Sequence, residues 1–133
     1  MFMTPDRLIH YTLGHPELDR QHVEMFRLMD SIITLLRGSR YAEADTYLDE
    51  LYTYTLTHNV FEYQLMTESD FPFKENHTDH NKGVIKAMQK LKDHIGREFV
   101  THYEIVEFED ALSNHIDFSD RQIVEHMKAN GMI

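Results

Sequence analysis

The chain has no cysteine, and its 133 residues include only five glycines and three prolines. Without thiols it has no disulfide, no thiolate nucleophile and no cysteine-ligated zinc or iron–sulfur centre. Histidine and carboxylate are the strong metal donors that remain. The scarcity of glycine and proline, with 41% hydrophobic and 27% charged residues, favours one mostly helical domain with a modest core.

Basic residues and long apolar runs are also scarce. Lys and Arg number 13 against 23 Asp and Glu, a formal net charge of −10. This charge repels phosphate backbones and anionic lipid, so we expect neither a nucleic acid nor a membrane as partner. No stretch reaches the roughly 18 apolar residues of a membrane span. The start lacks a basic region followed by an apolar run, so we expect a cytoplasmic protein.

Apolar periodicity and helix-breaking residues predict four helices after an extended arm of about residues 1–17. Their expected limits are Leu18 or Asp19 to Gly38, Tyr41 to Met66, after Pro72 to Ile95, and Tyr103 to Lys128. The apolar positions of the second helix include Leu48, Leu51, Leu56 and Val60. Short connections favour antiparallel neighbours. We therefore expect an all-α, up-down-up-down four-helix bundle over about residues 18–128, in one domain of residues 1–133 and monomeric by default.

Six residues of metal-ligand type fall at one height along this bundle. Measured from the first turn, His22 lies about 17 residues before it and His58 about 19 after it, a mismatch of ~3 Å at ~1.5 Å per residue. The later turns bring the rest into the same slab of roughly five residues, or ~8 Å. A slab of that size suits a two-metal centre. The six residues are His22, His58, Glu62, His77, His115 and Asp120.

The separate pairs within this set carry little weight. His58 and Glu62 at i,i+4 share a helix face, but one or two such pairs are expected by chance in so acidic a chain. His115 and Asp120 stand at i,i+5 and diverge further around a helix. The prediction of a metal centre therefore depends on the agreement of heights. Five other histidines fall outside the slab and are expected at the surface, at caps or in turns: His10, His15, His94, His102 and His126.

Four motifs resemble those of the hemerythrin family, in its single-domain bacterial form, over essentially the whole chain. They are Gly14-His15-Pro16-Glu17-Leu18-Asp19-Arg20-Gln21-His22, His58-xxx-Glu62-xxx-Met66, Phe71-Pro72 followed five residues later by His77, and Leu112-xx-His115-Ile116-xxx-Asp120. The resemblance implies a non-haem di-iron centre that binds dioxygen. It implies Glu62, Asp120 and an oxo or hydroxo group as bridges, His22 and His58 on one iron, and His77 and His115 on the other.

One departure from the family pattern lies in the third helix. The family carries HxxxH there, whereas this chain has His77 and Asn81, with His80 one residue early. Three outcomes are open: His80 substitutes through a local helix distortion, Asn81 or water fills the position, or the second iron is weakly held.

A second departure lies in the implied oxygen pocket. Leu112 and Ile116 match the family, but Ala111 stands where an aromatic residue is common. The smaller side chain either opens the pocket to water or a larger oxidant, or is absorbed by repacking.

The donor set favours binding over oxidation. The implied seven ligands are five histidines and two carboxylates. They form a softer donor set than that of the Glu-rich ferritin-like sites, which cleave the O–O bond. We expect an oxygen-binding protein for storage, delivery or sensing. The alternatives are a di-iron peroxidase or oxidase, with peroxide or another small ligand as partner, and an apo bundle that keeps only the architecture.

Overall fold

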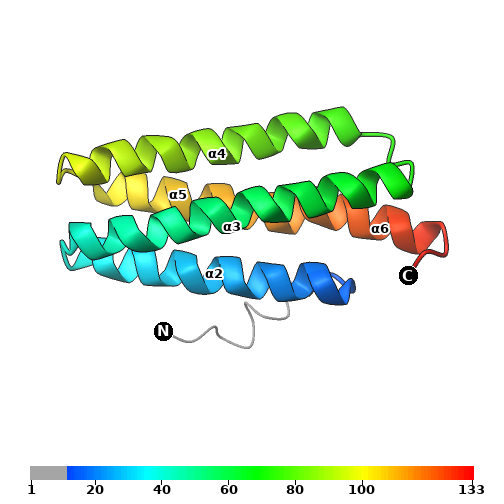
Figure 1. Ribbon diagram of the computed structural model, residues 1–133, viewed down its shortest axis with the longest axis horizontal. Helices are drawn as coiled ribbons and strands as arrows, with labels where there is room; N and C mark the ends of the chain where they lie inside the picture. The colour runs from blue at the N-terminus through cyan, green and yellow to red at the C-terminus, as the bar shows by residue number, and fades with distance from the viewer. Residues whose placement is uncertain (1–11) are drawn as a thin grey trace.

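The computed structural model describes residues 12–133, and all regular structure among them is helical (Figure 1). The elements are α2 (Pro16–Arg37), α3 (Tyr41–Glu68), α4 (Lys74–Gly96), α5 (His102–Asn114), the π-helix η1 (His115–Asp120) and α6 (Arg121–Ala129). Because α5, η1 and α6 follow one another without a break, they form the fourth rod of an all-helical bundle. Most of the expected arm, residues 1–11, lies outside the described residues.

The rods run back and forth along the long axis of the molecule (Figure 1). Helix α2 packs against α3 and α5, and α4 packs against α3, α5 and η1. This arrangement places the middle of every rod at the middle of the bundle. No helix in the described part of the chain is both long enough and apolar enough to cross a membrane.

Local sequence explains why α2 starts two residues earlier than expected. Pro16 occupies the first helical position, where its fixed φ and missing N–H carry no penalty. The Nδ1 atom of His15 accepts a hydrogen bond from the backbone N–H of Leu18 at 3.3 Å. The carboxylate of Asp19 accepts from the N–H groups of Leu13 and Gly14 at 2.8 and 3.1 Å. His15 therefore lies at a helix cap, one of the three kinds of place expected for the histidines outside the slab.

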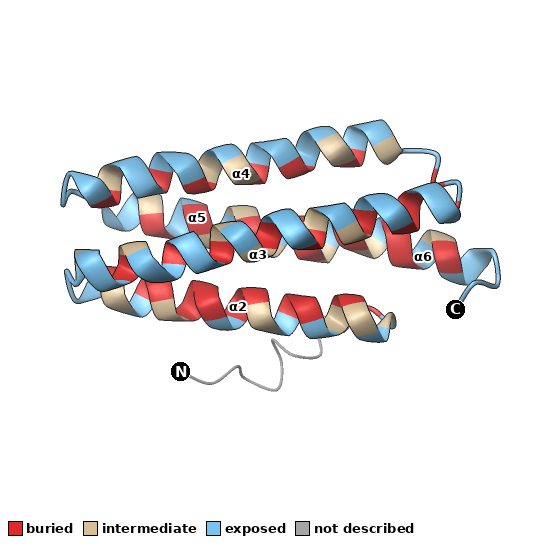
Figure 2. Ribbon diagram, in the orientation of Figure 1, coloured by how far each residue is buried: buried red, intermediate tan, exposed pale blue. Residues whose placement is uncertain are grey.

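Two apolar clusters fill the bundle, and Figure 2 shows the buried residues lining the inner faces of the rods. The larger cluster joins the end of α2 and the start of α3 to the end of α4 and to α5, through residues such as Met29, Leu51 and Met88. The smaller cluster lies at the other end and includes Leu18 and Ile123. The six polar residues predicted from the sequence lie between the two clusters, and we call them the polar layer.

The buried face of α3 differs from its apolar pattern. Leu56 and Val60 are 42% and 61% exposed, whereas Leu51 is fully buried. In this part of α3 the inner positions are held by His58 and Glu62, which are 1% and 0% exposed. Because polar residues occupy the core face, apolar residues are displaced outward, and hydrophobic periodicity does not identify the inner face there.

Candidate metal centre

The side chains of the polar layer converge in the middle of the bundle. Two groups of four residues each place one potential ligand atom per residue within 4.8 Å of the others. Glu62 and Asp120 belong to both groups, so the two carboxylates lie between two pairs of histidines. The most exposed member, His77, is only 4% exposed. The groups are His22, His58, Glu62 and Asp120, the first subsite, and Glu62, His77, His115 and Asp120, the second subsite.

In the first subsite both histidines present Nε2 to the carboxylates. His22 Nε2 lies 2.8 Å and His58 Nε2 3.1 Å from Asp120 Oδ2, and His58 Nε2 also lies 3.1 Å from Glu62 Oε1. On the other side of its ring, His58 Nδ1 donates to Gln21 Oε1 at 2.7 Å. This second contact fixes the ring and its tautomer, and leaves Nε2 to face the centre.

In the second subsite the histidines meet the other oxygen of Asp120. His77 Nε2 lies 3.2 Å and His115 Nε2 3.3 Å from Asp120 Oδ1. The same two atoms lie 3.4 and 3.8 Å from Glu62 Oε1. Asp120 therefore turns Oδ2 to one histidine pair and Oδ1 to the other, as a carboxylate that bridges two metal ions must do.

The π-helix explains how His115 and Asp120 come to lie side by side. In an α-helix, residues five apart are separated by about 500°, which is about 140° beyond a full turn. In a π-helix the backbone hydrogen bond joins residues i and i+5, so these residues lie about one turn apart. His115 and Asp120 are the first and last residues of η1. The predicted fourth helix is nearly correct in extent, but its central turn is of a different kind.

The electrostatics of the layer follow from burial and from the two shared carboxylates. Burial lowers the pKa of His58, but Glu62 and Asp120 outweigh it and raise that pKa to about 10. Against the same opposing burial, these carboxylates raise the pKa of His77 to about 9. Complete burial dominates at His115 and lowers its pKa to about 4. Burial opposes ionisation of Asp120 as well, but the histidines, His115 foremost, hold its pKa well below the usual range.

Buried polar atoms without hydrogen-bond partners show that the layer suits cations. Glu62 Oε2, His22 Nδ1 and both ring nitrogens of His115 lack such partners within the described chain. Leaving such atoms unsatisfied in a protein interior is costly. His115, which is neutral at pH 7, keeps a lone pair for a metal ion. Four imidazoles and two carboxylates are donors that iron and other divalent transition metals accept, so the residues present fit a two-metal centre.

The structure does not bring His80 into either group. Its side chain is exposed, and its ring stacks on the ring of His115 with centroids 5.3 Å apart and an interplanar angle of 12°. Asn81, one turn after His77, is instead 6% exposed and turned inward. Its Oδ1 is buried without a hydrogen-bond partner.

Of the residues expected around the oxygen pocket, Ile116 lies in η1, and Ala111 and Leu112 lie in α5. Leu112 and Ile116 are 1% and 0% exposed and belong to the larger apolar cluster, whereas Ala111 is half-buried. Sequence reasoning missed Gln21 as the partner of His58. The residue stands next to His22, but a glutamine before a histidine carries no signal by itself.

The fold and the site define a class: an all-helical bundle with a buried histidine and carboxylate cluster suited to metal ions. Within that class, the chain is similar to a bacteriohemerythrin from Stenotrophomonas maltophilia (strain R551-3). The two are 25% identical over 120 residues, which cover 89% of this chain and 78% of that protein. This similarity confirms the hemerythrin-like character predicted from the motifs. No protein-family model matches the chain, and no solved structure matches it significantly.

Proposed function

We propose that the polar layer holds two iron ions and that the protein binds dioxygen reversibly at them. The observation that carries the proposal is the position of Asp120, which presents a different carboxylate oxygen to each histidine pair. The bacteriohemerythrin relative supports iron as the metal.

Each residue of the layer has a part in this proposal. His22 and His58 hold one iron, His77 and His115 hold the other, and Glu62 and Asp120 bridge them with an oxo or hydroxo group. The irons, when bound, supply the electrons that dioxygen accepts. Gln21 orients His58 through its 2.7 Å hydrogen bond. Leu112 of α5 and Ile116 of η1, both buried, keep water from the site. An up-down-up-down topology accords with the course of the rods in Figure 1.

A second candidate, a di-iron peroxidase or oxidase, is favoured by one observation. The buried residue one turn after His77 is Asn81, and His80 is exposed. The second subsite therefore presents two histidines within the cluster instead of three, so a metal ion there would keep one coordination position for an external ligand. An open position of this kind favours reaction with peroxide over simple storage of oxygen.

The two candidates are separated by loading the protein anaerobically with ferrous iron, admitting oxygen and then degassing. Reversible oxygen binding predicts two irons per chain and a visible charge-transfer band that appears with oxygen and disappears on degassing. Peroxidase chemistry predicts rapid conversion to a ferric spectrum that degassing does not reverse. Glu62→Gln, which alters a residue of both subsites, should lower the iron content below two per chain, whereas Glu68→Gln, at the exposed end of α3, should behave as wild type. Absence of tight iron in the wild type would overturn both candidates.

A further inference from the structure

Surface hollows lie between the rods, and the linings of three of them differ in charge. The groove between α3 and α4, of about 370 Å³, is lined by Lys82 and Lys86 and by no carboxylate. The groove between α2 and α3, of about 540 Å³, is lined by Glu24, Asp49 and Glu50 and by no cation.

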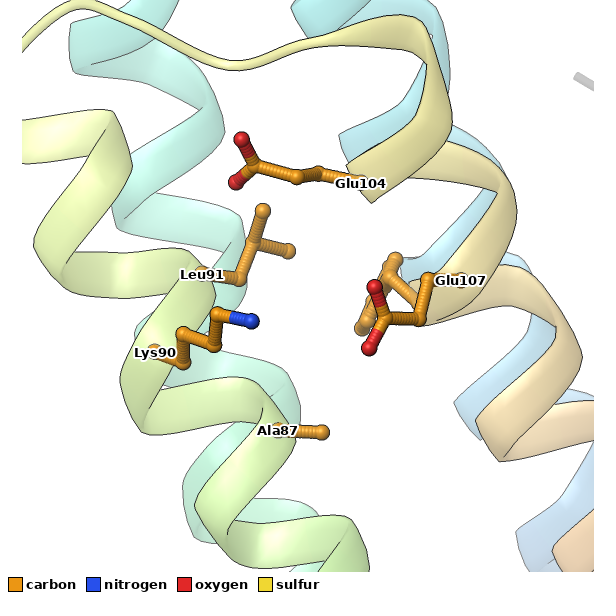
Figure 3. A pocket seen from close by; sticks show the side chains of 6 residues that line it. Ala87, Lys90, Leu91, Glu104 and Glu107 are labelled. Carbon is orange, nitrogen blue, oxygen red and sulfur yellow. The ribbon is translucent and has the colours of Figure 1, made fainter.

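The third hollow, between α4 and α5, has a volume of only about 30 Å³. Figure 3 shows Lys90 on one wall with Glu104 and Glu107 opposite. Its interior has room for about one water molecule, and its charges are mixed. It therefore offers no path for a charged ligand.

The lysines of the α3–α4 groove are weakly neutralised. The nearest carboxylate to Lys82 in an ion pair is that of Asp79, at 4.0 Å between two side chains that are 71% and 80% exposed. A third cation, Lys74, stands over the ring of Tyr63, itself a lining residue, at 4.9 Å. In a chain with a net charge of −10, such a cluster of cations gives this groove a local field that attracts anions.

The groove also reaches the neighbourhood of the metal centre. Two of its lining residues, Asn59 and Asn81, follow His58 and His77 by one residue and by one helical turn. The Oδ1 atoms of both amides are buried and lack hydrogen-bond partners. Asn81 is only 6% exposed, so its amide lies inside the bundle, and no atom of residues 12–133 donates a hydrogen bond to its oxygen. Such an amide is free to turn an N–H toward an incoming ligand.

We propose that the α3–α4 groove is the route by which small anions reach the second subsite, with Lys82 and Lys86 attracting them and Asn81 receiving them. The inference rests on the proposed function, because its destination is the metal at His77 and His115. It predicts that anionic ligands, such as azide or deprotonated peroxide, have faster access than neutral ligands of the same size. In the α2–α3 groove Glu24 pairs with Arg27 at 2.6 Å and Asp49 with Lys92 at 2.7 Å. This groove should therefore attract the same anions less than the α3–α4 groove does.

The field in the groove can be measured without any metal, because the chain contains no tryptophan. Tyr63→Trp places a single fluorophore in the α3–α4 groove, and Tyr54→Trp places its matched control in the α2–α3 groove. Quenching by iodide is compared with quenching by neutral acrylamide. We expect the iodide-to-acrylamide ratio to be at least about twofold higher for Tyr63→Trp and to fall with added salt. Equal ratios at the two positions would overturn the proposed field.

The route to the metal is tested with azide on the ferric, iron-loaded protein, by following the rate at which its charge-transfer band appears. Lys82→Gln with Lys86→Gln should slow azide binding several-fold at low salt and leave iron content unchanged. The matched double variant Asp49→Asn with Glu50→Gln, in the other groove, should not slow it. Nitric oxide, a neutral ligand, should bind the ferrous lysine variant at the wild-type rate.

Asn81→Leu tests the last step of the route. It should slow azide and leave the rate of nitric oxide binding near the wild-type value, because it removes the N–H donor that receives an anion and keeps a side chain of similar size. Unchanged azide rates in both the lysine and the Asn81 variants would overturn the route even if the wild type holds two irons. If the wild type takes up no iron, the proposed function fails instead, and the quenching ratios still decide whether the groove attracts anions.

Discussion

Asp120→Asn is the substitution that best separates the electrostatic role of the polar layer from its shape. It removes the one negative charge that lies within 3.3 Å of a ring nitrogen of all four histidines, and it keeps the size of the side chain. In metal-free protein the layer is held together by these contacts. Asp120 is fully buried, so water cannot replace the lost charge.

The magnitude follows from His58. Its pKa of about 10 lies three pH units above pH 7. At 1.36 kcal/mol per unit, binding of its proton at pH 7 is favourable by about 4 kcal/mol. Glu62 shares this effect with Asp120, so we expect Asp120→Asn to lower the free energy of unfolding of the metal-free protein by about 2–4 kcal/mol. That is a large fraction of a typical total of about 5–15 kcal/mol.

The pH dependence gives the sharper test. The raised pKa of His58 contributes stability that is fully present below pH 6.5 and is lost as the pH rises through about 10. The depressed pKa of Asp120 contributes stability above pH 3.8 that is lost as the pH falls. The difference between wild type and variant should therefore be largest near pH 5–6.5 and shrink towards pH 10.

The assay is urea unfolding with a chelator present, from pH 5 to pH 10. Asp110→Asn, at an exposed position on α5, is the matched control and should change stability by less than about 0.5 kcal/mol. A loss below about 1 kcal/mol at pH 7 for Asp120→Asn, or the same loss at pH 6 and pH 10, would refute the reasoning.

Leu51→Ala, at a fully buried position, should cost about 2–5 kcal/mol in urea unfolding, whereas Val60→Ala, at 61% exposure, should cost less than about 0.5 kcal/mol; equal losses would contradict the assigned inner face of α3. His80→Ala should leave the iron content at the wild-type value, measured by elemental analysis, and loss of one iron would make it a ligand. Deletion of Ser119 should turn the π-helix into an α-helix and reduce the iron content while circular dichroism stays helical; two retained irons would show that the π-helix is dispensable.

Much of the centre was accessible from the sequence, because helices have a fixed rise per residue. Counting residues from each turn is enough to place His22 and His58 at one height, and the structure brings them within reach of the same oxygen of Asp120. The count does not depend on which face a residue occupies. It therefore succeeded even on α3, where hydrophobic periodicity failed at Leu56 and Val60.

The kind of helix around His115 could not be read from the sequence in the same way. Hydrogen bonding to i+5 in place of i+4 depends on the packing and contacts that the extra width permits, and no residue type in His115–Asp120 specifies it. Because an α-helix was assumed there, the i,i+5 spacing of His115 and Asp120 counted against the pair. The sequence alone left open whether His80 or Asn81 faces the centre, because that depends on how α4 is rotated about its axis. The structure has Asn81 buried and His80 exposed.

The placement of the polar layer between two apolar clusters has a consequence for how the molecule opens. The smaller cluster, around Leu18 and Ile123, and the larger cluster lie on opposite sides of the polar layer, whose charges must balance. We therefore expect this end to open as a separate cooperative unit in the metal-free protein, with a lower free energy of opening and faster amide hydrogen exchange. A metal ion bound by residues of α2, α3 and the π-helix would join the two units. Exchange at the Ile123 end should then slow to the rate of global unfolding, so the molecule would become a single folding unit only when its centre is filled.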